Sequence, residues 1–334
     1  KDANDCLIKY GIQGIIESKN DFKQFPIEGV YTISDLSDSI MSMYINGLDK
    51  GVSLNIDGFD LNIVKGYLTI ITGIPSHGKS EWLDNMIVHL KKYSDWKGAL
   101  YSPENEPTEL HFSKMARKII GKHWEGENRI SIPELMDVQK YLDNYFFFIK
   151  PENEFTLESI LDRVRDTHLR YGIDWYLIDA WNKLDHKYTS TETKYISESL
   201  DAIIRFNKVY NLHCFFVAHP TKVPKDKQTG QFEVPNLYSI NGSAHFYNKA
   251  DNGITVYRNF ENNTTSIYRQ KVKFDHWGST GVSDYFFDKK RLRYNSTEIF
   301  DKSNWINSDK PQTLAEEMRN YKPTSYEQET FEIF

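Results

Sequence analysis

The chain has 334 residues and, with 41 Lys and Arg against 47 Asp and Glu, a formal net charge of −6 at pH 7. This acidic balance gives no support to a globally basic nucleic-acid binder, so any contact with DNA must come from a local patch. The two cysteines, Cys6 and Cys214, are too few and too far apart for a disulfide framework or a zinc site, and no apolar stretch approaches the ~20 residues of a membrane span.

The first 50 residues carry two helical patterns with a break between them. Residues 1–20 show a short helical spacing of apolar residues, and residues 21–30 are interrupted by Pro26 and Gly29. Apolar residues return at helical spacing over 32–50, which predicts a second helix. We therefore take 21–50 as a linker that contains a helix, and expect the core to begin near Gly51.

From Gly51 onward, predicted strands and helices alternate. The strand candidates are 67–72, 98–102, 145–149, 174–178 and 212–218. The helical patterns lie at 80–93, 108–120, 157–170 and 194–209. This alternation predicts an α/β fold with a mostly parallel sheet flanked by helices on both faces.

After residue 250 the pattern changes to strands joined by short turns. The candidates are 253–258, 265–274, 283–288 and 291–294, which predict a C-terminal antiparallel extension of the sheet. The core is thus expected to span 51–295. The remaining segment, 296–334, is polar, shows no sustained period, and is predicted to be a flexible acidic tail.

A complete phosphate-binding motif, G-x-x-x-x-G-K-[ST], occupies residues 73–80 between a predicted strand and a predicted helix. Its glycines let successive backbone N–H groups turn toward phosphates, and the helix N-terminus adds a positive dipole. The Lys79 ammonium is expected to reach the β/γ-phosphates, and the Ser80 hydroxyl to ligate Mg²⁺. The predicted nucleotide-binding residues are Gly73, Ile74, Pro75, Ser76, His77, Gly78, Lys79, Ser80 and Glu81.

Two carboxylates follow later strands and are candidates for the same site. Asp179 closes the apolar run 174–178, where such folds place a carboxylate that holds the metal's water shell; a turn cap is the alternative. Glu104 lies just beyond the strand 98–102 and could orient or deprotonate an attacking water. The alternative is that Glu104 or Glu106 only starts the next helix, where acidic residues suit the dipole.

Polar residues also follow the strand 212–218 and occur on a late strand. His219 is placed to contact a γ-phosphate, and the loop 220–240 after it is locally basic through Lys222, Lys225 and Lys227. These lysines suit DNA phosphates, although an ordinary solvated loop has the same composition. Lys273 on the late strand could act as a cation in a neighbouring subunit's site, or simply protect an edge strand.

Several blocks of the sequence resemble the RecA-type motor domain of replicative hexameric helicases, in particular the Twinkle-like and phage primase–helicase branch of the DnaB superfamily. The matching blocks, in the family's order, are 73–84, 101–106, 177–182, 217–222, 242–253 and 271–274. The resemblance implies a RecA-like P-loop NTPase core over 51–295. It also implies that residues 1–20 are the end of a Toprim primase-type domain, and that the 32–50 helix packs on an adjacent motor domain.

The resemblance assigns roles to individual residues. Lys79 and Ser80 match the phosphate and Mg²⁺ positions, Glu104 the catalytic glutamate, Asp179 the Walker B carboxylate, and His219 the γ-phosphate sensor. The family has an Arg finger in its late Lys-x-Arg motif, where this chain has Lys273. A lysine lacks the bidentate contact of a guanidinium, so Lys273 acts less well, Arg269 or another cation substitutes, or hydrolysis is slow. The implied DNA loops are 182–194 and 220–248, with Lys222, Lys225, Lys227 and Lys249 as predicted DNA-binding residues.

The expected function is an ATP-dependent replicative DNA helicase that uses ATP and Mg²⁺, encircles single-stranded DNA as a hexameric or heptameric ring, and separates strands. Two alternatives stay open: a recombinase-like DNA-dependent ATPase, and an ATP-gated DNA-binding or loading module with little turnover. The acidic end of the tail, 327–334, resembles a polymerase-docking tail, with a solvated end as the alternative. The expected location is the cytoplasm of a bacterium or phage-infected host, or the mitochondrial matrix, with no membrane partner.

Overall fold

The computed structural model describes residues 2–20, 27–186, 191–221, 223–225, 230–240 and 244–306. The chain separates into two compact units, Lys1–Asp49 and Lys50–Phe334. The first unit holds α1 (Ala3–Asn20), which is interrupted by a non-helical Gly11, and α2 (Ser37–Asn46). No residue of α2 is buried, although it carries Ile40, Met41, Tyr44 and Ile45.

The predicted helix over 32–50 is shorter in the structure, and both differences have local causes. Thr32 and Asp35 close a turn before the helix, in which the Thr32 N–H donates to Asp35 Oδ2 at 2.7 Å. Gly47 ends the helix with φ 80°, a conformation that suits glycine and breaks the helical path. Ile33 and Leu36 therefore lie in a turn, and Leu48 lies beyond the helix end.

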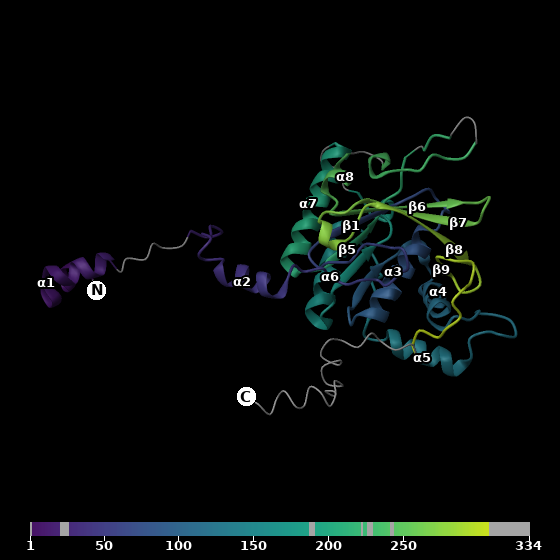
Figure 1. Cartoon of the computed structure of the whole chain (residues 1–334), viewed down its shortest axis with the longest axis horizontal. Coiled ribbons are helices and arrows are strands. Elements are labelled where there is room, and N and C mark those ends of the chain that lie inside the picture. The colour runs from purple at the N-terminus through teal and green to yellow at the C-terminus, as the bar shows by residue number, and fades with distance from the viewer. Residues whose placement is uncertain are drawn as a thin grey trace, which may run out of the picture. The chain divides into compact units, whose positions relative to one another are not determined.

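The second unit is built on a nine-stranded sheet of order β3-β2-β4-β5-β1-β6-β7-β8-β9 within the described residues (Figure 1). The strands are β1 (Leu68–Thr72), β2 (Gly98–Tyr101), β3 (Phe146–Phe148), β4 (Trp175–Ile178), β5 (His213–Val217), β6 (Asn252–Asn259), β7 (Thr264–Lys271), β8 (Gly281–Asp288) and β9 (Arg293–Asn295). Strands β3 to β6 in this order pair in parallel, whereas β6, β7, β8 and β9 pair antiparallel. The predicted mostly parallel sheet with an antiparallel extension is confirmed.

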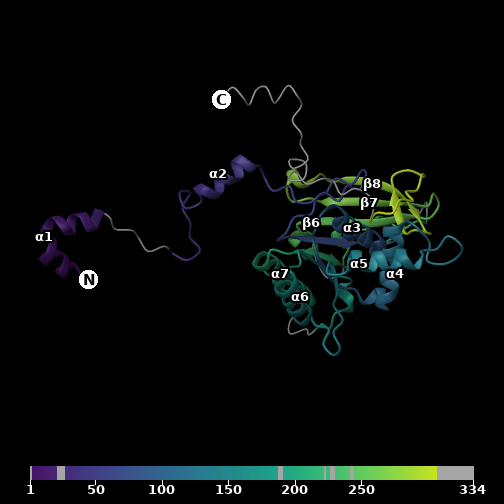
Figure 2. The ribbon, with the colours of Figure 1, turned by 90° about the horizontal axis from the view of Figure 1, so that it is seen from below.

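Helices cover both faces of this sheet, each over its own apolar cluster. The helices are α3 (Lys79–Tyr93), α4 (Thr108–Ile120), α5 (Ile132–Leu142), α6 (Leu157–Tyr171), α7 (Glu192–Tyr210) and α8 (His245–Lys249). Side chains of α3, α4 and α5 pack on one face, and those of α6, α7 and α8 on the other. Figure 2 shows α6 and α7 together on one side of the strands.

Trp82 of α3 joins the parallel part of the core to the antiparallel extension. Its fully buried ring lies 4.9 Å from Tyr285, 5.1 Å from Tyr294 and 5.3 Å from Phe59. Aromatic groups packed edge to face contribute beyond their buried area. The extension is therefore part of the hydrophobic core of the second unit rather than an appended hairpin.

Two helices were missed from the sequence and one strand was predicted too long. Helix α5 buries only Val138 and Leu142, yet its apolar residues recur at helical spacing and a capping box of Ser131 and Glu134 marks its start, so the sequence did carry a signal for it. The five-residue α8 is too short for a periodic signal. Strand β7 ends at Lys271 rather than at residue 274, because the chain turns into the 3₁₀ helix η4 (Asp275–Trp277).

The first residues of the predicted flexible tail pack on the core. Trp305 is 5% exposed, and its backbone N–H donates to the Ile119 carbonyl of α4 at 2.8 Å. Arg293 of β9 donates to the carbonyls of Asp301 and Ser303 at 2.9 and 2.7 Å. These contacts extend the ordered unit through residue 306; residues 307–334, and with them the polymerase-docking prediction, lie outside the described residues.

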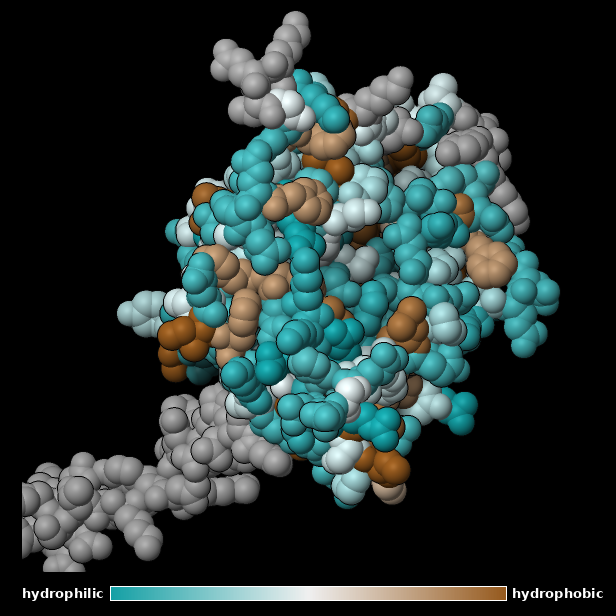
Figure 3. All heavy atoms as spheres, turned by 90° about the vertical axis from the view of Figure 1, so that its right-hand side faces the viewer, coloured by the Kyte–Doolittle hydropathy of each residue, from teal (hydrophilic) through white to brown (hydrophobic). Residues whose placement is uncertain are grey.

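Among the described residues, no helix combines the length and hydropathy that a membrane span requires. The face drawn in Figure 3 is mainly hydrophilic, with hydrophobic side chains in small groups.

His213 makes the stability of this fold pH-dependent. Its Nδ1 donates to the Val64 carbonyl at 2.7 Å and its Nε2 accepts from the Thr69 hydroxyl at 3.0 Å, and burial lowers its pKa to about 4. The unfolded chain takes up this proton near pH 6.5, so stability falls as the pH drops from about 6.5 to 4, by up to about 1.4 kcal/mol per pH unit. Urea unfolding at pH 7, 6 and 5 should show a shallower pH dependence for His213→Gln than for the wild type. Parallel curves for the two proteins would contradict this, and His123→Gln serves as the control.

Candidate active site

The phosphate loop follows β1 and passes so close to its neighbours that two positions require glycine. At Gly73, with φ 149°, a Cβ would lie 2.3 Å from the Val256 carbonyl oxygen of β6. At Gly78, with φ 93°, a Cβ would lie 2.9 Å from the Tyr294 hydroxyl. Only glycine adopts these conformations without a clash, so the loop can lie against the sheet and point its N–H groups outward.

His77 fastens this loop to strand β6. Its Nδ1 accepts a hydrogen bond from the Arg258 backbone N–H at 3.0 Å, and its ring lies 5.2 Å from those of Tyr257 and Phe260. Burial, followed by the charges of Lys79 and Arg258, lowers the pKa of His77 to about 4. The ring is therefore neutral near pH 7, which lets it accept this bond.

Lys79 holds the centre of the site. Its side chain is nearly buried, and Nζ donates to the Ile74 carbonyl of the loop at 3.1 Å. Burial lowers its pKa to about 8, partly offset by the carboxylates of Asp179 and Glu104. A desolvated ammonium between two carboxylates attracts a phosphate strongly, because few water molecules screen its charge.

Asp179, directly after β4, presents one free carboxylate oxygen to the same place. Its Oδ2 accepts from Ser102 at 3.1 Å and from Asn105 at 3.4 Å, whereas Oδ1 is buried without a hydrogen-bond partner among the described residues. Burial and then the charge of Glu104 raise its pKa to about 6. An unsatisfied carboxylate oxygen close to the Ser80 hydroxyl fits the oxygen ligands that Mg²⁺ prefers.

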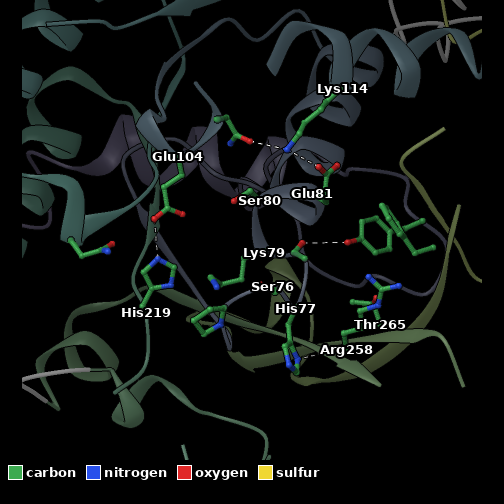
Figure 4. Close-up of a pocket in the computed structure, with 16 residues that line it drawn as sticks. Ser76, His77, Lys79, Ser80, Glu81, Glu104, Lys114, His219, Arg258 and Thr265 are labelled. Carbon is green, nitrogen blue, oxygen red and sulfur yellow. Dashed lines mark hydrogen bonds and ion pairs between the residues drawn. The ribbon is translucent and has the colours of Figure 1, made fainter. Parts of the chain in front are cut away.

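Glu104 and His219 face each other across the site (Figure 4). Glu104 lies in the 3₁₀ turn η1 (Pro103–Asn105) after β2, and its Oε1 is 3.5 Å from His219 Nε2 and 3.9 Å from Lys183 Nζ. Burial and the charge of Lys79 lower the pKa of His219. Its Nδ1 is buried without a hydrogen-bond partner among the described residues, and its Nε2 faces Glu104.

Glu81 extends the site toward α4, where two lysines bind it. Lys114 Nζ lies 2.9 Å from Glu81 Oε1, and the fully buried Lys118 bonds to Oε2. Burial alone would raise the pKa of Glu81, but Lys118 and Lys114 lower it to about 2. Glu81 is therefore an anion that fixes α3 to α4, and its predicted part in nucleotide binding stays a prediction.

His77, Lys79, Glu81, Glu104 and His219 line a cavity of about 820 Å³, whereas Asp179 is buried and is not among its lining residues. Further residues from outside the phosphate loop also line it. Asn105 and Asn182 lie in the matching blocks 101–106 and 177–182 but were given no role there, and no sequence motif marked Lys114, Arg258, Thr265, Phe287 and Tyr294. They come from α4, the antiparallel extension and the turns η1 and η2 (Trp181–Lys183). Among these residues, Arg258 lies in the antiparallel extension. Its guanidinium lies 5.8 Å from the centre of the Phe287 ring and donates to Asn263 Oδ1 at 3.0 Å.

Comparison with known proteins places this site in a family, although no family model matches the chain. The chain is 36% identical over 318 residues to the Arabidopsis thaliana "Twinkle homolog protein, chloroplastic/mitochondrial", an alignment that includes 90% of this chain and 44% of that protein. The chain belongs to the Twinkle-like family. Its RecA-type fold is that of DnaB-like ATPase domains. It spans less than half the length of the Arabidopsis relative.

Two solved structures share the fold of this DnaB/Twinkle-like domain. One, described as an ATPase domain, has a TM-score of 0.67 at 15% identity and covers 81% of this chain and 100% of its own. A DnaB-like replicative helicase, described with its interactions with primase, has a TM-score of 0.63 at 15% identity, covering 87% of this chain and 73% of its own. The predicted RecA-like fold and family are confirmed.

Lys273 lies away from the site of its own DnaB/Twinkle-like domain. Its Nζ is 2.6 Å from Asp251 Oδ1 and 5.0 Å from the centre of the Tyr67 ring. Asp251 and Tyr67 immediately precede β6 and β1, whereas the phosphate loop follows β1. Lys273 is therefore at the opposite edge of the sheet from Lys79.

Arg269, which we considered as a substitute cation, is committed within its own domain. Its guanidinium is nearly buried and donates to the Ser279 carbonyl at 3.0 Å and the Ser283 hydroxyl at 2.7 Å. These bonds connect β7 with the start of β8, so this side chain holds the extension together.

The predicted DNA-binding lysines fall into three groups. Lys222 and Lys227 lie outside the described residues. Lys225 pairs with Phe232 across an isolated bridge, with its Nζ 4.7 Å from the ring centre. Lys249 bonds to the Ser197 carbonyl at 2.9 Å and to Asp201 at 2.6 Å, which ties α8 to α7. Contact of these lysines with DNA stays a prediction.

Replacing Lys79 by alanine should remove nucleotide binding. Charge-assisted hydrogen bonds are worth about 1.5–3 kcal/mol, so we expect the affinity for magnesium-nucleotide to fall roughly 10- to 100-fold. A fluorescent nucleotide analogue measures this directly, with Lys140→Ala on the exposed side of α5 as the control. Equal affinity of the Lys79 variant and the wild type would show that the loop does not grip phosphate.

Proposed function

We propose that the chain is the motor of a replicative DNA helicase, which hydrolyses ATP, moves along single-stranded DNA as a ring and separates duplex strands. The observation that carries this proposal is the convergence of Lys79, Ser80, Glu104 and His219 on one cavity, with the buried Asp179 bonded to Ser102 and Asn105 beside it. The family relationship supports it, since the relatives are a Twinkle homolog and a DnaB-like replicative helicase.

Each residue has a role that its surroundings suit. Lys79 neutralises phosphate charge, and Ser80 and Asp179 would hold Mg²⁺, which when bound neutralises phosphate oxygens and orients the leaving group. Glu104 accepts the proton of the attacking water, whose oxygen bonds to the γ-phosphorus as ADP leaves. His219, neutral and 3.5 Å from Glu104, is placed to sense whether the γ-phosphate is present.

The position of Lys273 supports a site completed by a second copy of the chain. It lies at the sheet edge opposite Lys79, so it cannot serve its own site but is available to a neighbour's. The exposed apolar residues of α2, such as Met41, Tyr44 and Ile45, offer a surface for another copy. Together they support a closed homo-oligomeric ring of six or seven copies.

Single-stranded DNA is the proposed polymer that moves through this ring. The loop that contains Lys222, Lys225 and Lys227 would contact backbone phosphates, which makes binding largely independent of sequence and sensitive to salt. Lys249 would have to leave Asp201 before it could contribute. The Arabidopsis relative is described as chloroplastic/mitochondrial, so an organelle stands beside the cytoplasm as a proposed location.

A second candidate, an ATP-gated DNA-binding or loading module with little turnover, is favoured by one observation. The ammonium of Lys273 is already paired with Asp251 at 2.6 Å, and a lysine lacks the forked contact of an arginine finger. Turnover then depends on whether a neighbour's phosphate can draw Lys273 from this pair.

ATPase and strand-separation assays separate the two candidates. We expect single-stranded DNA to stimulate hydrolysis by the wild type, and a forked duplex to be unwound. Glu104→Gln should retain nucleotide binding but lose about 10²–10⁴-fold in turnover, because the proton acceptor is gone. A wild type that binds ATP well and remains inert with DNA would favour the loading module.

Mixing two inactive variants tests whether the site is shared between copies. Glu104→Gln and Lys273→Ala should each be nearly inactive alone. In co-assembled rings roughly a quarter of the interfaces would combine an intact Glu104 with an intact Lys273, so part of the ATPase activity should return. Wild type mixed with Glu104→Gln gives the reference for dilution. If subunit exchange is verified and the mixture still shows no recovery of ATPase activity, Lys273 is not the shared cation.

A further inference from the structure

Lys114 of α4 connects the two segments that carry the reactive groups of the site (Figure 4). Its Nζ donates to Asn105 Oδ1 at 2.9 Å and lies 2.9 Å from Glu81 Oε1. Glu81 directly follows Ser80 in α3, and Asn105 directly follows Glu104 in η1. One ammonium thus bonds to the neighbours of a proposed magnesium ligand and of the proposed base.

The Asn105 amide passes this connection on to Asp179. Its Nδ2 donates to the Ser102 hydroxyl at 2.9 Å and lies 3.4 Å from Asp179 Oδ2, and the Ser102 hydroxyl itself donates to Oδ2 at 3.1 Å. Asn105 is 5% exposed, so few water molecules can take over these bonds. The orientation of the amide consequently decides whether the Asp179 carboxylate faces the amide nitrogen, which donates hydrogen bonds, or the amide oxygen, which only accepts them.

Lys114 determines that orientation, because an ammonium can only donate hydrogen bonds. It must bond to the oxygen end of the amide, and this turns the nitrogen end toward Ser102 and Asp179. With the amide reversed, its oxygen would face the carboxylate, and the two acceptors would repel each other. The direction of this one side chain therefore depends on Lys114.

The packing of α3 on α4 does not by itself account for Lys114. Lys118, one turn further along α4, is fully buried and bonds to the other oxygen of Glu81. Glu81 would thus keep a cationic partner, and α3 its contact with α4, without Lys114. What Lys114 adds is its bond to Asn105, and its side chain also lines the cavity.

We propose that Lys114 is a positioning residue which orients Asn105, and through it the Asp179 carboxylate and the turn that carries Glu104. This inference rests on the proposed nucleotide hydrolysis at this site. Removing Lys114 should leave nucleotide itself bound, because Lys79 and the loop are untouched. It should weaken the binding of the divalent cation and slow the chemical step. Mutating a residue that hydrogen-bonds to a metal ligand typically lowers metal affinity or activity by about 10–100-fold.

The test compares Lys114→Met, Lys114→Arg and Asn105→Ala with the wild type in the full chain. For Lys114→Met we expect unchanged nucleotide affinity in EDTA, a roughly 10-fold weaker Mn²⁺ affinity of the nucleotide complex by electron paramagnetic resonance, and a 10- to 100-fold lower kcat. In Lys114→Arg the guanidinium also only donates hydrogen bonds, so this variant should recover most of the Mn²⁺ affinity and most of the kcat. The Lys114→Met/Asn105→Ala double variant should be little worse than either single variant, because the two residues act as one unit.

Lys122→Met is the matched control, since it removes an ion pair with Glu134 of 2.7 Å just beyond the same helix. Thermal unfolding checks that each variant is folded. Unchanged Mn²⁺ affinity in a folded Lys114→Met protein would overturn the inference, whether or not the wild type hydrolyses ATP. Weaker Mn²⁺ binding together with an inactive wild type would support the positioning role while refuting the proposed hydrolysis.

Discussion

The parallel alignment of β2, β4, β5 and β1 is the constraint on which the site depends. Because these strands run in one direction, the residues that follow them meet at one edge of the sheet, although they are up to about 140 residues apart in sequence. Glu104, Asp179, His219 and Lys79 are brought together in this way. Burial then acts on them jointly: it lowers the pKa of Lys79 and raises that of Asp179, so the cavity holds charges that a magnesium-nucleotide would satisfy.

The two ends of the antiparallel extension make different contacts. At one end, β6 accepts the phosphate loop through the bond between Arg258 and His77, and Tyr294 of β9 reaches Gly78. At the other end, beyond β7, Lys273 is paired with Asp251. A strand pair that touches its own nucleotide site and offers a cation at the opposite edge provides a physical connection between successive sites of the proposed ring.

Sequence reasoning succeeded where a residue pattern has a strong local cause, and failed where it does not. The phosphate loop, the buried strands and the long helices have periodicity or turn chemistry that can be read directly. Helix α5 is an exception, since it was missed although Leu135, Val138, Tyr141 and Leu142 recur at helical spacing. The end of β7 was misplaced because Lys271 to Phe274 keep strand-like alternation while the backbone turns. Trp305 shows the same limit, since its burial under the predicted tail comes from contacts with α4.

The sequence by itself determined the nucleotide loop, the alternation of the main strands and helices, and the carboxylates and histidine at the strand ends. These are local properties, and parallel strands leave few ways to arrange their ends. Only the tertiary structure decided that Asn105, Lys114 and Arg258 belong to the same cavity, that Arg269 is committed to its own domain, and that Lys273 faces away from its own site. Those outcomes depend on contacts between side chains that are far apart in the sequence. Packing brings these side chains together, and no local residue spacing encodes the contacts.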